Sequence, residues 1–416
     1  MKISKRGVSA AIATVATGAL LALGTPAIAA NQTVTLWVDS GTATAIGKEV
    51  KAFGAKNGIT VNVVTKDFGT LRTAATTAIP TGNGPDILAG AHDWTGKLVG
   101  AGVIAPVNLG ANANFFSDAA LSGFKVGGKL YGVPGWTENI ALVYNKKFTP
   151  TPTKDLKTAI ANKQVEIGFD ANNGDPYHFA SISTSFGLSQ YTRANGTWTT
   201  KIGMGGANGA KYAAWLASAK GGKSIVRAGG DWDTLNGQLQ DGVVKYWITG
   251  PWAVGGLESQ HSYKNAAGAT VKSTVMQASD IGVATIPSVG GSLVHQFSGV
   301  RGYWESIKVP GSDKAVSVGK VLNFLAGPVA QLASFTNSNV TPANQVALAK
   351  VSDPVLKAFG AAGVNAYPMA SFVFQDTTWS KIGLAEAGLI AGKGDANPAA
   401  YWQNAMDALQ TVINAS

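Results

Sequence analysis

The pattern of hydrophobic and polar residues near the start of the chain changes from alternation to helical spacing and back. A strand is predicted first, with hydrophobic residues on one face at Val34, Leu36 and Val38. Between residues 43 and 53 hydrophobic residues recur every three or four positions, which predicts a helix ending at Asn57-Gly58. A second β-rich run covers residues 59–64. This order predicts a βαβ unit, with parallel strands and a right-handed crossover.

Strand and helix patterns continue to alternate along the rest of the chain, with no repeat period and no low-complexity linker. The pattern therefore predicts a compact α/β fold throughout. The predicted elements are a helix at 71–79, a strand at 86–91, a hairpin at 124–134 that turns at Gly127-Gly128, a buried strand at 138–144, and helices at 212–219 and 316–325.

The N-terminal segment has the features of a secretory signal. Lys2, Lys5 and Arg6 precede an apolar run at 8–23, and the small-residue triplet Ala27-Ile28-Ala29 follows it. The pattern predicts a signal peptide at 1–29, removed so that the mature chain begins at Ala30 or Asn31. A retained anchor is the alternative, but the run barely reaches the thickness of a bilayer. We therefore expect an exported protein, in the periplasm or at the exterior of the cell envelope.

Composition narrows the possible functions. The sequence contains no cysteine, which excludes thiol catalysis, Cys-ligated zinc and attachment of a lipid to cysteine, so we expect no lipid anchor. The length of 416 residues fits two domains better than one. The net charge is +10, and +7 without the three leader cations, but Lys and Arg are scattered singly. This spacing argues against a nucleic-acid groove.

No catalytic or cofactor motif stands out. Residues 217–224 match a relaxed phosphate-loop pattern, but a predicted helix precedes them where a strand is required. The four histidines lack metal-ligand spacing, and no G-x-S-x-G elbow occurs. We therefore expect no metal and no cofactor. Asp93, Glu138 and Asp175 could still serve as the acid and base of a glycoside hydrolase.

Several carboxylates lie beside aromatic residues in the sequence. Asp93 adjoins Trp94, Glu138 is two residues from Trp136, and Asp175 is two residues from Tyr177. Asp231 and Asp233 flank Trp232. Sugars present hydroxyl groups at their rims and apolar C–H faces, so a sugar site combines carboxylate acceptors with flat rings. The clustering predicts carbohydrate binding.

The order of these segments resembles the bacterial extracellular solute-binding proteins of the maltose-binding type. The resemblance covers almost all of the predicted mature chain. It is carried by Leu36-Trp37-Val38, Lys56-Asn57-Gly58-Ile59-Thr60-Val61, Gly82-Asn83-Gly84-Pro85-Asp86-Ile87, Ala91-His92-Asp93, Leu142-Val143-Tyr144-Asn145-Lys146, Asp175-Pro176-Tyr177 and Gly250-Pro251-Trp252-Ala253.

The resemblance implies a type II periplasmic binding-protein fold, with two lobes that each hold a mainly parallel sheet flanked by helices. It places residues 31–136 and 287–310 in the N-terminal lobe, and 138–282 and 314–416 in the C-terminal lobe. The lobes would close over a sugar by bending at crossings near 136–138, 282–287 and 310–314. The closed form, a monomer, would deliver the sugar to the transmembrane permease subunits of an ABC importer.

By position, the resemblance implies a set of ligand-binding residues. Asp93, Glu138 and Asp175 would accept hydrogen bonds from hydroxyl groups, and Tyr177, Trp252 and Trp379 would stack on sugar faces. Asp39 ends the first strand where the family commonly has Asn, and Trp232 stands where it often has Tyr.

The departures from the family pattern lie in the first lobe. Gly41 and Thr42 replace an acidic and a lysine contact, Gly90 replaces a stacking Trp, and Trp94 replaces an Arg. Trp94 or Trp136 could restore a ring. Maltose or a maltooligosaccharide is therefore the leading candidate for the ligand, and a related oligosaccharide is the alternative. The other functions left open are the glycoside hydrolase and a structural wall protein held by its positive charge.

Overall fold

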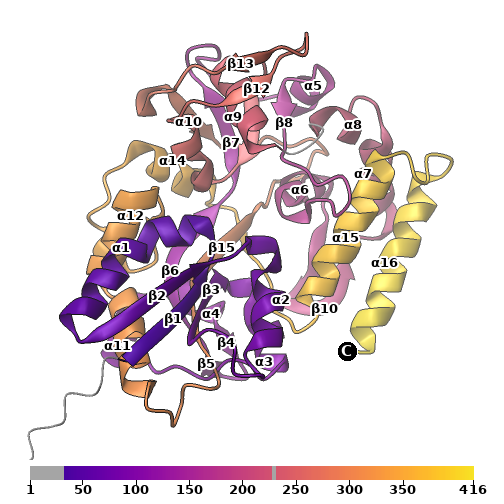
Figure 1. Cartoon of the computed structure of the whole chain (residues 1–416). Coiled ribbons are helices and arrows are strands. Elements are labelled where there is room, and N and C mark those ends of the chain that lie inside the picture. The colour runs from indigo at the N-terminus through magenta and orange to yellow at the C-terminus, as the bar shows by residue number, and fades with distance from the viewer. Residues whose placement is uncertain (1–31, 227–230) are drawn as a thin grey trace, which may run out of the picture.

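The computed structural model describes residues 32–226 and 231–416. The predicted signal peptide and the expected new N-terminus lie outside these residues. Two sheets, each covered by helices, divide the chain into two lobes, one below the other in Figure 1. The α/β prediction is confirmed.

The sheet of the first lobe has the strand order β16-β6-β15-β3-β1-β2, and β17 pairs with β15. Its parallel core confirms the predicted βαβ unit, because β1 pairs with β2 from Gln32 opposite Ile59 to Val38 opposite Thr65. The strands are β1 (Gln32–Val38), β2 (Ile59–Thr65), β3 (Ile87–Ala91), β6 (Gly132–Asn139), β15 (Phe297–Glu305), β16 (Thr341–Pro342) and β17 (Tyr367–Pro368).

The sheet of the second lobe has the order β14-β7-β11-β8. Only β11 and β8 run parallel, while β7 is antiparallel to both β11 and β14. In the first lobe β15 is likewise antiparallel to β3 and β6. The expectation of mainly parallel sheets was wrong, because strands that cross between the lobes enter each sheet in the opposite direction. The strands are β7 (Ala141–Asn145), β8 (Val165–Glu166), β11 (Tyr246–Thr249) and β14 (Ile281–Ala284).

Local signals in the sequence set where the elements begin and end. Asp39 caps the first helix by accepting from the backbone N–H of Thr42, and Gly58 follows its end with a φ of 67°. The hairpin of β4 (Lys125–Val126) and β5 (Lys129–Leu130) turns at Gly127-Gly128, both with positive φ, as predicted. The first-lobe helices before the crossing are α1 (Ser40–Lys56), α2 (Phe68–Ala78), α3 (Thr95–Gly100) and α4 (Asp118–Ser122).

Two later helices belong to the first lobe, against expectation. The buried face of α11 (Ala315–Ala326), with Val318 and Leu325, lies in the same core as Leu36 of β1. The following α12 (Pro328–Ser338) packs on α1, and β16 then pairs with β6. Assigning 314–416 wholly to the second lobe was therefore wrong. The apolar face of α11 is buried by β1 and α1, which lie about 280 residues earlier.

A crossing into the second lobe consequently falls between α13 (Gln345–Leu348) and α14 (Pro354–Ala362), not at 310–314, and β17 then pairs with the start of β15 before α15 (Gln375–Ile390) begins. Val355 and Phe359 of α14 pack in the second-lobe core with Ile281. The first crossing is close to its predicted place, since β6 passes into β7 with a break at Ile140. Other second-lobe helices are α5 (Leu156–Ala161), α6 (Pro176–Ser183), α7 (Gly206–Ala217), α8 (Gly222–Ile225), α9 (Trp232–Gln240), α10 (Val254–Leu257), α15 (Gln375–Ile390) and α16 (Pro398–Asn414).

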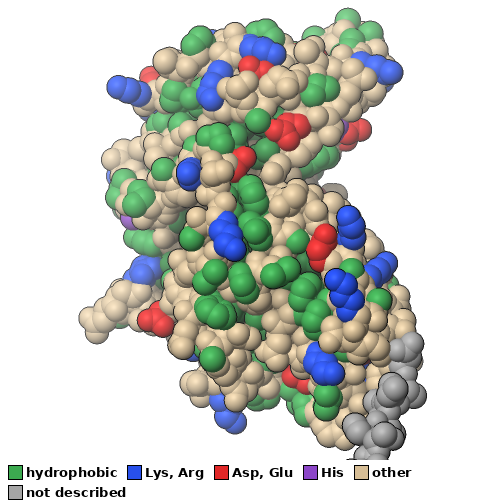
Figure 2. Space-filling model, turned by 90° about the vertical axis from the view of Figure 1, so that its left-hand side faces the viewer, with side chains coloured by type: hydrophobic (Ala, Val, Ile, Leu, Met, Phe, Trp, Pro, Cys, Tyr) green, Lys and Arg blue, Asp and Glu red, His purple; other side chains and the backbone are tan. Residues whose placement is uncertain are grey.

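Within residues 32–226 and 231–416, no single helix is long and apolar enough to cross a membrane. Together α11 and α12 would be long and apolar enough, but a bend of 62° separates them. On the face shown in Figure 2, Lys and Arg side chains stand apart from one another and the molecule narrows between its two halves.

Candidate functional site

A cleft of about 950 Å³ opens between the two lobes. Both lobes contribute to its lining, and the structure brings together every residue that the sequence suggested as ligand-binding. These residues are Asp39, Asp93, Trp94, Trp136, Glu138, Asp175, Tyr177, Trp232, Trp252 and Trp379.

The aromatic wall of the first lobe is built around Trp94. The ring follows β3 through a 3₁₀ turn (His92–Trp94) and folds back over Gly90, where a Cβ would lie 2.2 Å from the ring. Trp304 stacks on it at 6.1 Å, and Phe68 lies 5.0 Å away. Trp94 is therefore only 4% exposed. The Trp94 ring occupies the space that a side chain at residue 90 would fill.

We expect Gly90→Ala to destabilise the protein by about 1–3 kcal/mol, because a methyl group there must push the Trp94 ring out of a packed site. Thermal unfolding measures the change. The matched control is Gly47→Ala in α1, where an added Cβ has no atom within 4 Å. That variant should be neutral or up to about 1 kcal/mol more stable, since Ala is the better helix former. Equal melting temperatures for the two variants would contradict this packing.

The second lobe presents a more accessible aromatic surface. Trp252 comes from the 3₁₀ turn Pro251–Ala253 after β11 and folds back over Gly250. Its ring is half-buried, with Tyr177 at 6.2 Å and the edge-on ring of His178 at 5.9 Å. Trp232, at the start of α9, is 40% exposed. These rings leave faces open to the cleft on which an apolar ligand surface can stack.

Two of the carboxylates have local partners in the fold. Asp175 caps α6, and its second oxygen lies 2.5 Å from Nδ1 of His178. Asp39 accepts from the backbone N–H and the hydroxyl of Thr42 and pairs with Arg301. Burial acts in the opposite direction, but Arg301 and Thr42 hold the pKa of Asp39 below its usual value. The capping role of both residues explains why Asp begins these helices.

Glu138 and Asp93 line the cleft from the first lobe, and both have raised pKa values. Burial raises the pKa of Glu138, and the charge of Arg301 opposes this change. Burial also raises the pKa of Asp93 to about 6, although the indole N–H of Trp379 donates a hydrogen bond to it. That hydrogen bond measures 2.9 Å and joins the lobes. Both carboxylates therefore gain stabilisation if a ligand donates hydrogen bonds to them.

Sequence reasoning missed several residues that line the same cleft. Arg301 is one of them, and its signal was a lone cation within the strand 297–305. Arg72 forms an ion pair with Asp376 of α15 at 2.7 Å, which is a second connection between the lobes. The other lining residues that were missed include Phe68, His178, Asn337, Asn339 and Met369.

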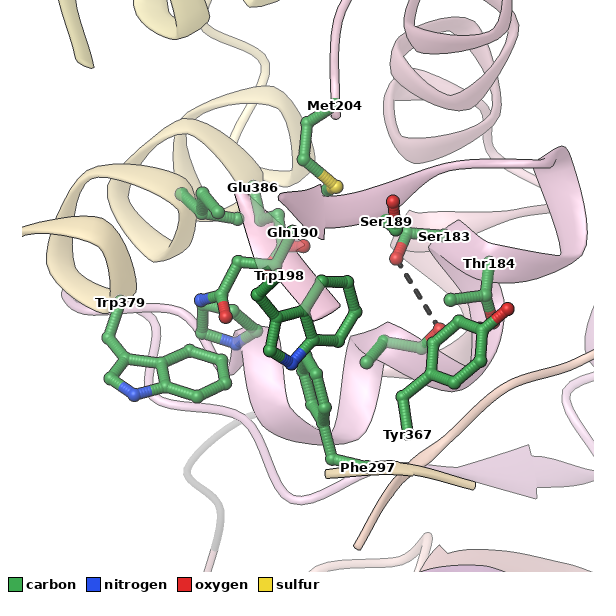
Figure 3. Close-up of a pocket in the computed structure, with 13 residues that line it drawn as sticks. Ser183, Thr184, Ser189, Gln190, Trp198, Met204, Phe297, Tyr367, Trp379 and Glu386 are labelled. Carbon is green, nitrogen blue, oxygen red and sulfur yellow. Dashed lines mark hydrogen bonds between the residues drawn. The ribbon is translucent and has the colours of Figure 1, made fainter. Parts of the chain in front are cut away.

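A smaller cavity lies behind the cleft, and Trp379 borders both (Figure 3). Its volume is about 10 Å³, the size of a single water molecule, so it cannot hold a sugar. Figure 3 shows Trp198, Phe297 and Tyr367 closing one side of it. The Trp198 indole donates to the Pro368 carbonyl at 2.8 Å, which fixes the hairpin of β9 (Ser189–Ala194) and β10 (Thr197–Gly203) against β17. The residues around this cavity therefore support Trp379.

Comparison with known proteins identifies the family. The model for bacterial extracellular solute-binding proteins matches residues 48–362. The chain belongs to this family. Within the described residues, no group of three or more His, Cys, Asp or Glu side chains could hold a metal ion.

Relatives of known name support the assignment over most of the chain. The chain is 26% identical to the maltodextrin-binding protein MdxE of Bacillus subtilis (strain 168), over 72% of this chain and 70% of that one. It is 24% identical to a maltooligosaccharide ABC transporter solute-binding lipoprotein of Streptococcus pneumoniae (strain ATCC BAA-255 / R6), over 88% and 86%.

This chain also shares its fold with a protein of solved structure. That protein is the Thermus thermophilus maltotriose binding protein bound with maltotriose, with a TM-score of 0.75 and 24% identity. The match covers 91% of this chain and 100% of that chain. The two-lobed type II fold is thereby confirmed.

Proposed function

We propose that this family member is the receptor of an ABC importer, and that it captures a maltooligosaccharide or a related oligosaccharide in the interlobe cleft. The observation that carries the proposal is the pairing of open aromatic faces with carboxylates around one cavity of about 950 Å³. A cavity of this size suits a small molecule of several rings. The names of the relatives point to the same class of ligand.

In the proposed mechanism each lobe contributes a different part of the recognition. Trp252 and Tyr177 stack on the C–H faces of the sugar, while Glu138 and Asp93 accept hydrogen bonds from its hydroxyl groups. Binding energy from both lobes favours the closed form, which the molecule reaches by bending at the segments that cross between the lobes. The closed form then docks on the transmembrane permease subunits as a monomer.

Export and retention form a further part of the proposal. The family is extracellular, and we infer that the chain acts in the periplasm or on the exterior of the envelope. The Streptococcus relative is a lipoprotein by name. These 416 residues contain no cysteine to carry a lipid, so we propose retention without a cysteine-linked anchor.

Hydrolysis of a bound glycoside is the alternative activity. The pKa of Asp93, raised to about 6, would suit a general acid. However, both oxygens of Asp175 are bound by His178, and Trp379 holds Asp93. We therefore propose binding without catalysis. Release of reducing ends from maltotriose by the purified protein would contradict this proposal.

A thermal-shift screen over sugars, followed by calorimetry, tests the proposed function. A ligand at 100 times its dissociation constant adds about 2.7 kcal/mol to the stability of the folded protein. We expect maltotriose or a related oligosaccharide to stabilise the folded protein. This stabilisation should not require cell-wall polymer. Retention on anionic wall that is lost at high salt, without stabilisation by any sugar, would instead support the structural wall protein.

We expect Glu138→Gln to weaken sugar binding by about 1–2 kcal/mol, roughly five- to thirty-fold. The amide keeps the shape and one acceptor but loses the charge that strengthens the hydrogen bond. Calorimetry at pH 7 measures the change. The matched control is Glu305→Gln, because burial also raises the pKa of Glu305 but the residue does not line the cleft. An equal loss of affinity in both variants would contradict a ligand-binding role for Glu138.

A further inference from the structure

Arg301 occupies a central position at the base of the cleft. It lies on β15, paired with Ala91 of β3 on one side and Trp136 of β6 on the other. Its side chain lines the cleft although the strand around it is otherwise uncharged from Phe297 to Trp304. A lone guanidinium in such a strand needs compensating partners, and the structure supplies them.

The guanidinium group of Arg301 is held in one orientation. One terminal nitrogen donates to the Asp39 carboxylate and, at 3.2 Å, to the Thr42 hydroxyl. The ring of Phe68 lies 4.3 Å from the guanidinium carbon and that of Trp136 lies 5.7 Å from it. The side chain is 12% exposed. The contacts therefore fix the planar group before any ligand arrives.

Asp39 and Thr42 use only one of the three nitrogens of this fixed group. Nε of Arg301 is buried and has no hydrogen-bond partner in residues 32–226 and 231–416. The buried hydroxyl of Tyr177 likewise lacks a partner within those ranges. The charge of Arg301 acts on both Tyr177 and Glu138, so the three polar groups share one region of the cleft. An unpaired buried donor is costly, and a ligand oxygen would relieve that cost.

We propose that Arg301 is a specificity-determining residue that donates a hydrogen bond to an uncharged oxygen of the sugar, while Asp39 and Thr42 act as its positioning residues. This inference rests on the proposed function. It revises two expectations from the resemblance. Asp39 acts through Arg301 rather than on the sugar, and the cation missing at Thr42 is supplied from β15.

The charges around Arg301 define the class of ligand. Asp39 already pairs with the guanidinium, and Glu138 lies in the same region. A carboxylate on the sugar would meet two acidic side chains and one cation, which disfavours it. The site therefore selects neutral oligosaccharides over sugar acids.

Calorimetry with maltotriose tests the role of Arg301. We expect Arg301→Gln to weaken binding roughly ten- to a hundred-fold, the range for a hydrogen bond from a charged donor. Arg301→Lys keeps the charge beside Asp39 but lacks the Nε donor, so it should lose affinity while its melting temperature stays near that of the wild type. Arg193→Gln is the matched control, because that guanidinium also lies 4.5 Å from two rings but outside the cleft. The affinity of the Arg193→Gln variant for maltotriose should be unchanged.

A double-mutant cycle separates contact from positioning. Asp39→Asn should weaken binding in the wild type and have no further effect in the Arg301→Gln background, because Asp39 acts through Arg301. Additive losses would overturn the positioning role. The acid made by oxidising the reducing end of maltotriose should bind more weakly than maltotriose. Tighter binding of this acid would overturn the assigned ligand class.

Two results distinguish this inference from the function on which it rests. If the wild type binds maltotriose and both Arg301 variants bind it equally well, the inference fails and the proposed function stands. If the wild type binds no oligosaccharide of a broad panel, the proposed function fails and this inference fails with it.

Discussion

Trp252→Ala should weaken sugar binding by roughly 2–4 kcal/mol, which is a loss of about 30-fold to several hundred-fold in affinity. The ring lies half-buried at the cleft, supported by Tyr177 and His178. Stacking on a sugar face contributes about 0.5–1.5 kcal/mol beyond the apolar area that the ring buries. Since the exposed face of Trp252 has no protein partner to lose, the variant should remain folded. Calorimetry and intrinsic fluorescence measure both effects.

The matched control for this prediction is Trp215→Ala. Trp215 is also half-buried and packs on Tyr212 and Phe186, but it does not line the cleft. We expect the Trp215→Ala substitution to lower the melting temperature and to leave the affinity for sugar unchanged. If Trp252→Ala instead lowers the melting temperature of the unliganded protein by more than about 5 °C with affinity intact, Trp252 is a core residue and the ligand binds elsewhere.

Asp93→Asn should stabilise the unliganded protein at pH 8 by roughly 2–3 kcal/mol, and should weaken sugar binding. Burial raises the pKa of Asp93 to about 6, so the folded state binds the proton more tightly than the unfolded state. A tenfold difference in proton affinity between the two states corresponds to about 1.36 kcal/mol. The cost of the charged form is absent below about pH 4, grows between pH 4 and 6, and is complete above pH 6. Asparagine removes this cost and can still accept from Trp379.

Melting temperatures measured from pH 4 to 8 test this prediction. The difference between Asp93→Asn and the wild type should be small at pH 4 and largest above pH 6. Asp118→Asn on the exposed first turn of α4 is the control and should change the stability at pH 8 little. A variant that is less stable than the wild type at pH 8 would show that the Asp93 charge stabilises the fold.

These two predictions describe one property of the cleft. The open ring of Trp252 and the buried charge of Asp93 leave interactions unformed in the unliganded protein. A sugar that stacks on the ring and donates to the carboxylate forms them. Sites that bind ligands commonly reduce stability in this way.

Local features of the chain were predictable from sequence because they depend on neighbours. Alternation at Val34, Leu36 and Val38, the Asp39 cap and the turn at Gly127-Gly128 each need only a few adjacent residues. The pairing of Asp93 with Trp94 and of Glu138 with Trp136 was visible for the same reason. All ten residues suggested as ligand-binding line the one cleft, although their contact with a sugar stays a prediction.

Long-range contacts were decided by the tertiary structure alone. Arg301 lies 262 residues after Asp39, and Trp379 lies 286 residues after Asp93. Neither pairing can be read from the local pattern, because each depends on how β15 or α15 packs against segments far away in the sequence. The sequence of α11 likewise does not indicate which lobe buries its apolar face, since either lobe could do so. The sequence therefore determined the elements and most of the cleft lining, while packing between distant segments decided the lobe boundaries and the orientation of Arg301.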